Sequence, residues 1–170
     1  IAHDVLRLGE ELGEGQFGRV LAASTREQDG ATRRAHTSGV PLGLRVAVKT
    51  MRRDRMTAAQ HRDVLRECQL HIDVDHPYVI TCLGWTSPPD GSGDFWMILE
   101  MASGSSLEEH SAARGRQGET VPQALLALWA LQVAVAVEHL HGRGILHRDI
   151  ATRNVCLVND SSLAARGGEQ

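Results

Sequence analysis

The sequence predicts an α+β chain in two parts, a five-stranded antiparallel sheet with one helix followed by a mainly helical part. Short strand-like runs separated by turn signals and loops recur between residues 7 and 100, and a single amphipathic helix interrupts them at 57–73. After Leu107 the pattern changes to a short polar helix and then a long apolar helix from Pro122 to about His141. We therefore divide the chain at 1–102 and 103–170.

Each element of the first part has its own signal. Two strands surround a glycine loop within 7–24, a compact apolar strand at 46–48 ends at Lys49, and further strands are expected at 78–83 and 95–100. The helix begins at Thr57, where Gln60 three residues on completes a capping box. The polar stretches at 25–43 and 159–170 lack an apolar period, so we expect a solvated loop and a solvated tail.

Composition and charge exclude several functions. The 170 residues carry 18 basic and 21 acidic side chains, and the net charge of −3 disfavours nucleic acid or an anionic membrane as the main partner. No uninterrupted apolar run reaches ~18 residues, so no membrane span is expected within the chain. The three cysteines are far apart without C-x-x-C spacing, which indicates a reducing compartment rather than disulfides or zinc.

The two ends of the sequence suggest a longer parent protein. The first residues are neither a signal peptide nor an initiator methionine, so we expect the chain to begin at a cut. The long helix is apolar nearly all round and must be covered on several sides. Few residues follow it, so we expect the covering elements to lie beyond Gln170.

The hexapeptide GEGQFG at 13–18 matches the pattern G-x-G-x-x-G. A dinucleotide site would need a helix at the third glycine, whereas residues 19–23 predict a strand, and no Lys-Ser/Thr pair follows to form a P-loop. A glycine hairpin between strands still suits phosphate, because backbone N–H groups can approach anionic oxygens closely. The alternative is an ordinary flexible hairpin.

Lys49 is the single lysine among the 18 basic residues, and its place after an apolar strand predicts an ammonium carried into a cleft. One face of helix 57–73 carries residues three or four apart: Val64, Glu67, Leu70, His71 and Val74. A carboxylate on an inward face needs a cation, since breaking a buried pair costs about 3–5 kcal/mol. We therefore predict a Lys49–Glu67 ion pair, with two separately exposed charges as the alternative.

The segment ILHRDIATRNV at 145–155 places Asp149 and Asn154 five residues apart in a loop after a helix that ends in glycines. A carboxylate and an amide in this arrangement can orient a hydroxyl nucleophile and hold a hard cation such as Mg²⁺. A surface ion-pair loop is the alternative for the segment taken alone. Its place behind a glycine loop, a lysine strand and a helical glutamate favours the catalytic interpretation.

These motifs, in this order and over about residues 5–158, resemble the eukaryotic protein kinase family. The resemblance implies a bilobal kinase-like fold, with a nucleotide-binding N-lobe and hinge at 1–102 and part of the C-lobe at 103–170. It implies ATP and Mg²⁺ as cofactors and proteins or peptides as substrates. It also implies a cytoplasmic location, which includes the intracellular part of a receptor whose membrane span would lie upstream.

The family's catalytic roles carry over by position. Gly13, Gly15 and Gly18 would cover the ATP phosphates. Lys49 would bind the α- and β-phosphates and be held by Glu67. In the later loop, Asp149 would orient the substrate hydroxyl and accept its proton, and Asn154 would hold one Mg²⁺.

The adenine site implied by the family is formed by Leu12, Val20 and Ala47 as its roof. Backbone groups of Glu100 and Ala102 would form the hinge hydrogen bonds. Leu99 would be the gatekeeper, and Cys156 stands where a leucine usually forms the floor, so we expect it to be a small buried hydrophobe.

The loop also resembles one branch of the family. Serine/threonine kinases usually carry a lysine two residues after the catalytic aspartate, where this chain has Ala151. The segment HRDIATRN resembles the H-R-D-L-A-A-R-N of receptor-type tyrosine kinases, in which the later arginine, here Arg153, neutralises phosphate charge. We therefore expect transfer of the γ-phosphoryl group to protein tyrosine.

One departure from the family is large. The chain contains no Asp-Phe-Gly, so the carboxylate for a second Mg²⁺ is missing, and we expect the 170 residues alone to transfer phosphate weakly or not at all. The alternatives are a pseudokinase or nucleotide-binding scaffold without catalysis, and a gene fragment with no stable fold.

Overall fold

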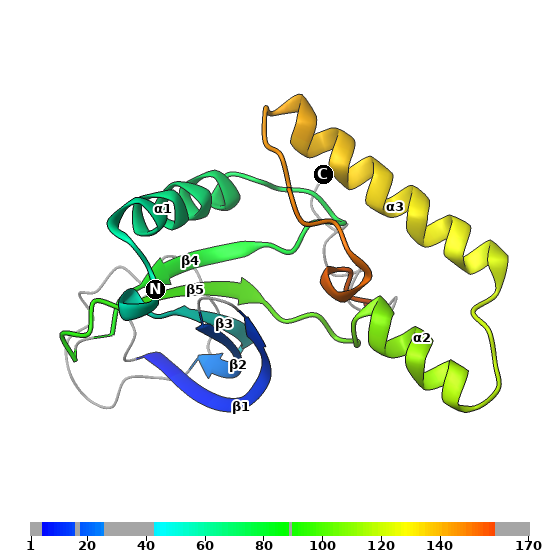
Figure 1. The fold of residues 1–170 in the computed structure, drawn as a ribbon, viewed down its shortest axis with the longest axis horizontal. Coiled ribbons are helices and arrows are strands. Elements are labelled where there is room, and N and C mark those ends of the chain that lie inside the picture. Colours follow the sequence, from blue (N-terminus) through cyan, green and yellow to red (C-terminus); the bar gives the residue numbers. More distant parts are fainter. Residues whose placement is uncertain (1–4, 16–17, 26–42, 89, 159–170) are drawn as a thin grey trace. The chain divides into compact units, whose positions relative to one another are not determined.

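The computed structural model describes residues 5–15, 18–25, 43–88 and 90–158, which fall into two compact units (Figure 1). The first unit comprises Ile1–Val74 and Thr81–Met101, and the second comprises Asp75–Ile80 and Ala102–Gln170. The tail expected at 159–170, the interior of the loop expected at 25–43 and the tip of the glycine loop lie outside the described residues. The assignment of nucleotide binding to 1–102 stays a prediction.

The first unit is built on the predicted five-stranded antiparallel sheet. Its strands are β1 (Leu6–Gly15), β2 (Gly18–Thr25), β3 (Arg45–Met51), β4 (Cys82–Thr86) and β5 (Phe95–Glu100), in the spatial order β1-β2-β3-β5-β4. The glycine hairpin, the lysine strand and β5 occur where the sequence predicts them. Register shifts in β1 between Leu8 and Gly13 interrupt its pairing with β2 just before the glycines.

The strand expected at 78–83 is placed wrongly, because β4 begins only at Cys82. His76 forms a turn in which its ring Nδ1 accepts the Tyr78 N–H at 3.2 Å and its carbonyl oxygen accepts the Val79 N–H at 3.1 Å. These N–H groups are used locally and cannot join a strand ladder. The turn thus overrides the strand propensity of the aromatic and β-branched residues that follow it.

The predicted helix is confirmed as α1 (Ala58–Ile72), which follows the short 3-10 turn η2 (Arg53–Arg55). The hydroxyl of Thr57 accepts the Gln60 N–H at 3.2 Å, and the Gln60 side chain accepts the Thr57 N–H at 2.9 Å. This reciprocal capping box satisfies two backbone donors that the first turn leaves open.

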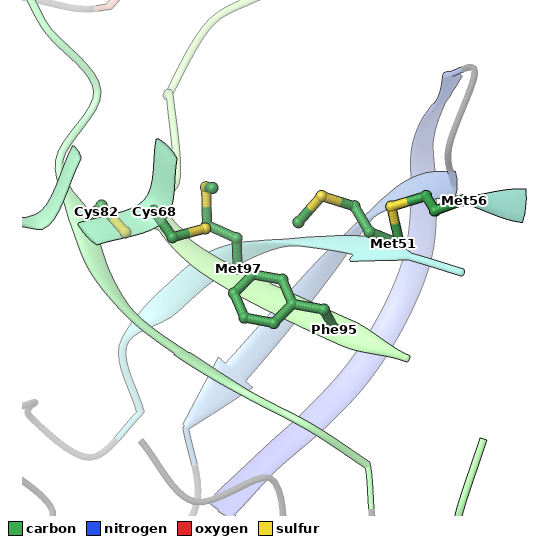
Figure 2. Packing of buried hydrophobic residues seen from close by; sticks show 6 residues of the cluster. All are labelled: Met51, Met56, Cys68, Cys82, Phe95 and Met97. Atoms are coloured by element: carbon green, nitrogen blue, oxygen red, sulfur yellow. The ribbon is translucent and has the colours of Figure 1, made fainter. Parts of the chain in front are cut away.

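The two faces of the sheet form separate apolar clusters. The cluster beneath α1 consists of Met51, Met56, Cys68, Cys82, Phe95 and Met97 (Figure 2). In Figure 2 the two cysteines lie at one end of this cluster, and Met51 and Met56 lie at the other. The cluster on the opposite face consists of Leu6, Ala23, Val46, Val48 and Ile98.

The buried face of α1 differs from the one predicted. Cys68 is fully buried, and Val64 and Leu65 pack against the same cluster, whereas Glu67 and Leu70 are exposed. Cysteine acts here as a small hydrophobe at one end of the cluster, near Met97 (Figure 2). Burying the stripe centred on Cys68 leaves the neighbouring carboxylate in water, which avoids the cost of burying a charge.

The second unit contains both predicted helices, α2 (Leu107–Arg116) and α3 (Gln123–Gly142), and the 3-10 turn η3 (Thr152–Asn154). Ser106 and Glu109 form a capping box at the start of α2, with bonds of 3.2 and 2.9 Å between side chains and backbone. The two helices meet where the rings of His110 and Trp129 pack edge to face, 5.6 Å apart. This contact fixes one point of α2 against α3.

The long helix α3 is apolar nearly all round, as predicted, yet Ala136 and Leu140 are its buried residues, and Leu131 is 61% exposed. Among the described residues it is the one helix long and apolar enough to cross a membrane, by length and composition alone. Gln132 and Glu138 interrupt its apolar residues, so the sequence contains no unbroken run of ~18 although the helix as a whole is apolar.

Candidate active site

Strand register places the predicted nucleotide-binding residues of the first unit on one face of the sheet. Val20 lies opposite Lys49, and Ala47 lies opposite Leu99. Opposite residues share a face, as do residues two apart on a strand. The face thus carries Val20, Ala47 and Lys49 together, with Ala47 buried and the ammonium group of Lys49 exposed.

The glycines of the hexapeptide have different surroundings. A Cβ built on Gly13 would meet nothing within 4 Å, whereas one built on Gly18 would lie 1.8 Å from the carbonyl oxygen of Thr50. Gly15 ends β1 directly opposite Gly18, and Leu12 on the same strand is 46% exposed. Packing therefore requires the third glycine, while the first leaves its backbone open to approach by a ligand.

The predicted Lys49–Glu67 ion pair is not formed. Both side chains are exposed, and the ion pairs within the described part of the chain do not include them. Burial is the main cause that raises the pKa of the Cys68 thiol to about 12. Cys82 and Glu67 raise this pKa further, whereas Lys49 lowers it. Glu67 stays exposed because Cys68 holds the inward position on this helix.

Glu100 is fixed at the end of β5, where the hinge is predicted. Its N–H donates to the carbonyl oxygen of Thr81 at 3.0 Å, and its carboxylate Oε1 accepts the Thr81 N–H at 2.8 Å. The half-buried Ala102 follows as the first residue of the second unit's main segment. The hinge roles of both residues stay predictions.

The loop after α3 brings Asp149, Arg153 and Asn154 together. The Asn154 amide Nδ2 donates to Asp149 Oδ2 at 2.9 Å and to the Asp149 carbonyl oxygen at 2.8 Å. Arg153 forms an ion pair with Asp149 Oδ1. The hydrogen bond from Asn154, followed by that from Arg153, lowers the pKa of the Asp149 carboxyl, so this exposed group is an anion at neutral pH.

Backbone geometry around Asp149 is a feature that the sequence pattern did not reveal. Arg148 has a φ of +64°, a left-handed conformation that is uncommon for a residue with a side chain and costs on the order of 1–3 kcal/mol. The Asp149 N–H donates to the His147 ring Nδ1 at 3.3 Å. Strain of this kind clusters at functional sites, where the surrounding structure holds it in place.

The segment after this loop is tied to the start of α2, which the sequence reasoning also missed. The Leu107 N–H donates to the Val155 carbonyl oxygen at 2.7 Å, and the Leu157 N–H donates to the Ser105 carbonyl oxygen at 2.9 Å. A Cβ on Gly104 would lie 2.4 Å from the Leu157 carbonyl oxygen, so these backbones pack in direct contact. The S-x-x-E pattern at 106–109 signals the start of α2, but no local pattern indicates its contact with residues 155–157.

Cys156 is exposed rather than buried as expected. Its backbone forms an isolated bridge with Ser106. Val155 and Leu157 take the half-buried positions on either side of it, because alternate residues of an extended segment point in opposite directions.

Comparison with known proteins identifies the class to which this geometry belongs. Residues 6–165 match the family described as protein tyrosine and serine/threonine kinase. The chain is 30% identical over 161 residues to the spermatocyte protein spe-8 of Caenorhabditis elegans, 31% identical over 160 residues to the tyrosine-protein kinase Abl of Drosophila melanogaster and 30% identical over 169 residues to the tyrosine-protein kinase Mer of Mus musculus. These matches cover 95%, 93% and 96% of this chain but 28%, 8% and 16% of the respective relatives.

The chain therefore belongs to the protein kinase family, and its fold is consistent with the N-lobe and the start of the C-lobe of a kinase. The family match includes the whole of α3, so we interpret this apolar helix as part of the C-lobe rather than as a membrane span.

Proposed function

We propose that this chain is the nucleotide-binding and catalytic-loop part of a protein tyrosine kinase, which transfers the γ-phosphoryl group of ATP to tyrosine hydroxyls. The observation that carries the proposal is the hydrogen-bonded pair formed by Asp149 and Asn154, with Arg153 ion-paired to the same carboxylate. The loop that holds them is strained at Arg148 and anchored on α2, which suits a site whose geometry must be kept.

The oxygens of this loop fit a hard cation. The Asn154 side chain uses its NH₂ group on Asp149, which leaves its amide oxygen available as a ligand. Asn154 would hold Mg²⁺, and the cation would neutralise charge on the phosphoryl oxygens. The lowered pKa of Asp149 keeps the carboxylate ionised, so it can accept a proton.

In the proposed reaction, Asp149 orients the substrate hydroxyl and takes its proton as the hydroxyl oxygen bonds to the γ-phosphorus and the bond to ADP breaks. Arg153 contributes positive charge beside the same position. On the sheet, Val20, Ala47 and Leu12 would cover the adenine, with Leu99 beside it.

The phosphate-binding roles belong to Lys49 and to the glycines of the hexapeptide. The backbone of Gly13 is open to approach, and Lys49 stands exposed on the face that carries Val20 and Ala47. The lysine's role in this proposal depends on an ion pair with Glu67, which the two exposed side chains do not form in this structure.

Tyrosine specificity is supported by the residue types of the loop. Ala151 takes the place where a lysine is usual in serine/threonine kinases, and Arg153 stands two residues later. The names of the relatives Abl and Mer include tyrosine-protein kinase, while the family description covers both specificities. The substrates would be cytosolic proteins or peptides that present tyrosine, and the parent protein would be a cytoplasmic or receptor-type kinase.

A pseudokinase or nucleotide-binding scaffold is the alternative, and one observation favours it. Lys49 and Glu67 are both exposed and do not pair with each other in this structure. A chain held in this arrangement would bind nucleotide or partners without efficient transfer.

The test measures phosphoryl transfer by the purified chain. Mg²⁺ and ATP labelled at the γ-phosphorus are supplied with a copolymer of glutamate and tyrosine or one of glutamate and serine, with Asp149→Asn as the matched variant. We expect weak labelling of the tyrosine polymer that falls to background in Asp149→Asn, because a general base contributes about 10²–10⁴-fold. Labelling confined to the serine polymer would refute tyrosine specificity, and equal labelling by the unaltered chain and Asp149→Asn would refute the proposed role of Asp149.

A further inference from the structure

The backbone pairing of β2 with β3 ends in an unusual way beside the glycine-rich hairpin. The ladder runs from Ser24 opposite Arg45 to Val20 opposite Lys49. The next residues, Arg19 and Thr50, are joined through a side chain instead. The Arg19 N–H donates to Thr50 Oγ1 at 3.2 Å, and Thr50 Oγ1 donates to the Arg19 carbonyl oxygen at 3.0 Å. One hydroxyl therefore satisfies both backbone polar groups of Arg19.

Gly18 adds a steric constraint at the same point. Its Cα lies so close to β3 that a Cβ would overlap the Thr50 carbonyl oxygen at 1.8 Å. The hydroxyl of Thr50 thus holds the base of the hairpin, and its carbonyl limits how closely the hairpin can approach. Together the two contacts limit how far the base of the hairpin can move toward or away from β3, which we call the height of the hairpin.

Other contacts of the hairpin are weaker. Arg19 pairs with Glu11 at 3.3 Å and Arg55 pairs with Glu14 at 3.6 Å, but the side chains of both pairs are well exposed to solvent. Exposed ion pairs contribute little to stability, so they do not fix a conformation. The half-buried Thr50 side chain is therefore the best-defined link between the hairpin base and β3.

Thr50 directly follows Lys49 but faces the other way. Thr50 lies opposite Trp96, whereas Lys49 lies opposite Met97, and successive residues of a strand point to opposite faces. A nucleotide held on the Lys49 face cannot touch the Thr50 hydroxyl. Any effect of that hydroxyl on nucleotide binding must be transmitted through the hairpin.

We infer that Thr50 is a positioning residue, which holds the glycine-rich hairpin at the height needed to cover the nucleotide phosphates. The inference rests on the proposed function, because it assumes that the phosphates bind beneath this hairpin. The interaction responsible is the pair of hydrogen bonds that the Thr50 hydroxyl forms with the backbone N–H and carbonyl oxygen of Arg19.

The test compares three variants of the full chain. Thr50→Val keeps the shape but removes the hydroxyl, Thr50→Ser keeps the hydroxyl, and Thr86→Val is the matched control on β4. The Thr86 hydroxyl has no hydrogen-bond partner among the described residues. Calorimetric titration with Mg·ATP measures affinity, and amide hydrogen exchange by NMR measures protection of the Arg19 N–H without nucleotide.

We expect Thr50→Val to weaken Mg·ATP binding about tenfold and to speed exchange of the Arg19 amide by a similar factor. Thr50→Ser and Thr86→Val should stay within about twofold of the unaltered chain. Normal binding by Thr50→Ser would identify the hydroxyl as the source of the effect. If packing were the cause, Thr50→Ser would also weaken binding, because it lacks the methyl group.

Three results would overturn the inference. If the unaltered chain binds Mg·ATP and Thr50→Val binds it equally well, Thr50 does not position the hairpin, although the proposed function stands. If exchange accelerates throughout the sheet, Thr50 supports the fold as a whole and not the hairpin in particular. If the unaltered chain does not bind Mg·ATP, the proposed function fails and the positioning role falls with it.

Discussion

Replacing Gly18 with alanine should displace the glycine-rich hairpin by a distance that the structure sets. The added Cβ would lie 1.8 Å from the Thr50 carbonyl oxygen, and real Cβ atoms essentially never come within 3.0 Å of such an atom. The strands must therefore separate by at least 1.2 Å, the difference between these two distances. A shift of this size strains the packing by about 1–3 kcal/mol and breaks the hydroxyl clamp on Arg19.

The matched control is Gly13→Ala, because a Cβ at Gly13 meets nothing within 4 Å. Urea unfolding should give a free energy of unfolding about 1–3 kcal/mol lower for Gly18→Ala, and a value equal to or slightly above that of the unaltered chain for Gly13→Ala. Mg·ATP affinity should fall with the displaced hairpin in Gly18→Ala, since misplacement by about 1 Å can cost 10²-fold in a positioned site. Equal stability of the two variants would refute the steric reasoning.

Three further predictions concern stability. Cys68→Ser places a hydroxyl in a fully buried apolar site and should lower the free energy of unfolding in urea by about 1–3 kcal/mol, and an unchanged value would contradict the packing described. Burial, followed by the charge of His139, lowers the pKa of His76, whose ring lies 4.8 Å from that of His139. The unfolded chain then binds a proton on His76 more tightly than the folded chain does. Stability that is present at neutral pH should therefore be lost as the pH falls below about 6.5. Thermal unfolding should show a smaller loss for His139→Phe. Gly104→Ala should lower the melting temperature because its Cβ would overlap a backbone oxygen. Gly115→Ala, in open space within α2, should raise it. A higher melting temperature for Gly104→Ala than for Gly115→Ala would contradict these contacts.

Elements with local signals could be predicted from the sequence. The capping box of Thr57 and Gln60 places the start of α1, and the apolar run at 95–100 coincides with β5. The order of glycine hairpin, lysine strand and helix also fixes the sheet-plus-helix architecture of the first unit. For α1 and β5 the deciding signals lie within a few residues along the chain.

The sequence-based predictions are wrong where a local pattern is compatible with two structures. The residues at 78–83 favour a strand by propensity, but the ring and carbonyl of His76 take the N–H groups that a strand would need. Periodicity in α1 allows the buried stripe to be centred near Glu67 or near Cys68. Packing in the cluster with Met51, Cys82 and Met97 decides for the cysteine, and these residues are distant from it in sequence.

Some features of the candidate site could likewise be predicted from local sequence, and others could not. The five-residue spacing of Asp149 and Asn154 predicts their proximity, and the structure brings them into hydrogen-bond contact. The left-handed backbone of Arg148 leaves no trace in residue type. The clamp between Arg19 and Thr50 joins residues 31 apart, so no local pattern could reveal it.

The central claim is that this chain binds the phosphates of ATP on the sheet face that carries Lys49. Calorimetric titration of the 170-residue chain with Mg·ATP, beside a Lys49→Met variant, tests it most directly. We predict saturable binding of one nucleotide per chain, with an affinity at least about tenfold lower when the ammonium is removed. Absence of binding by the unaltered chain, or equal binding by Lys49→Met, would contradict it.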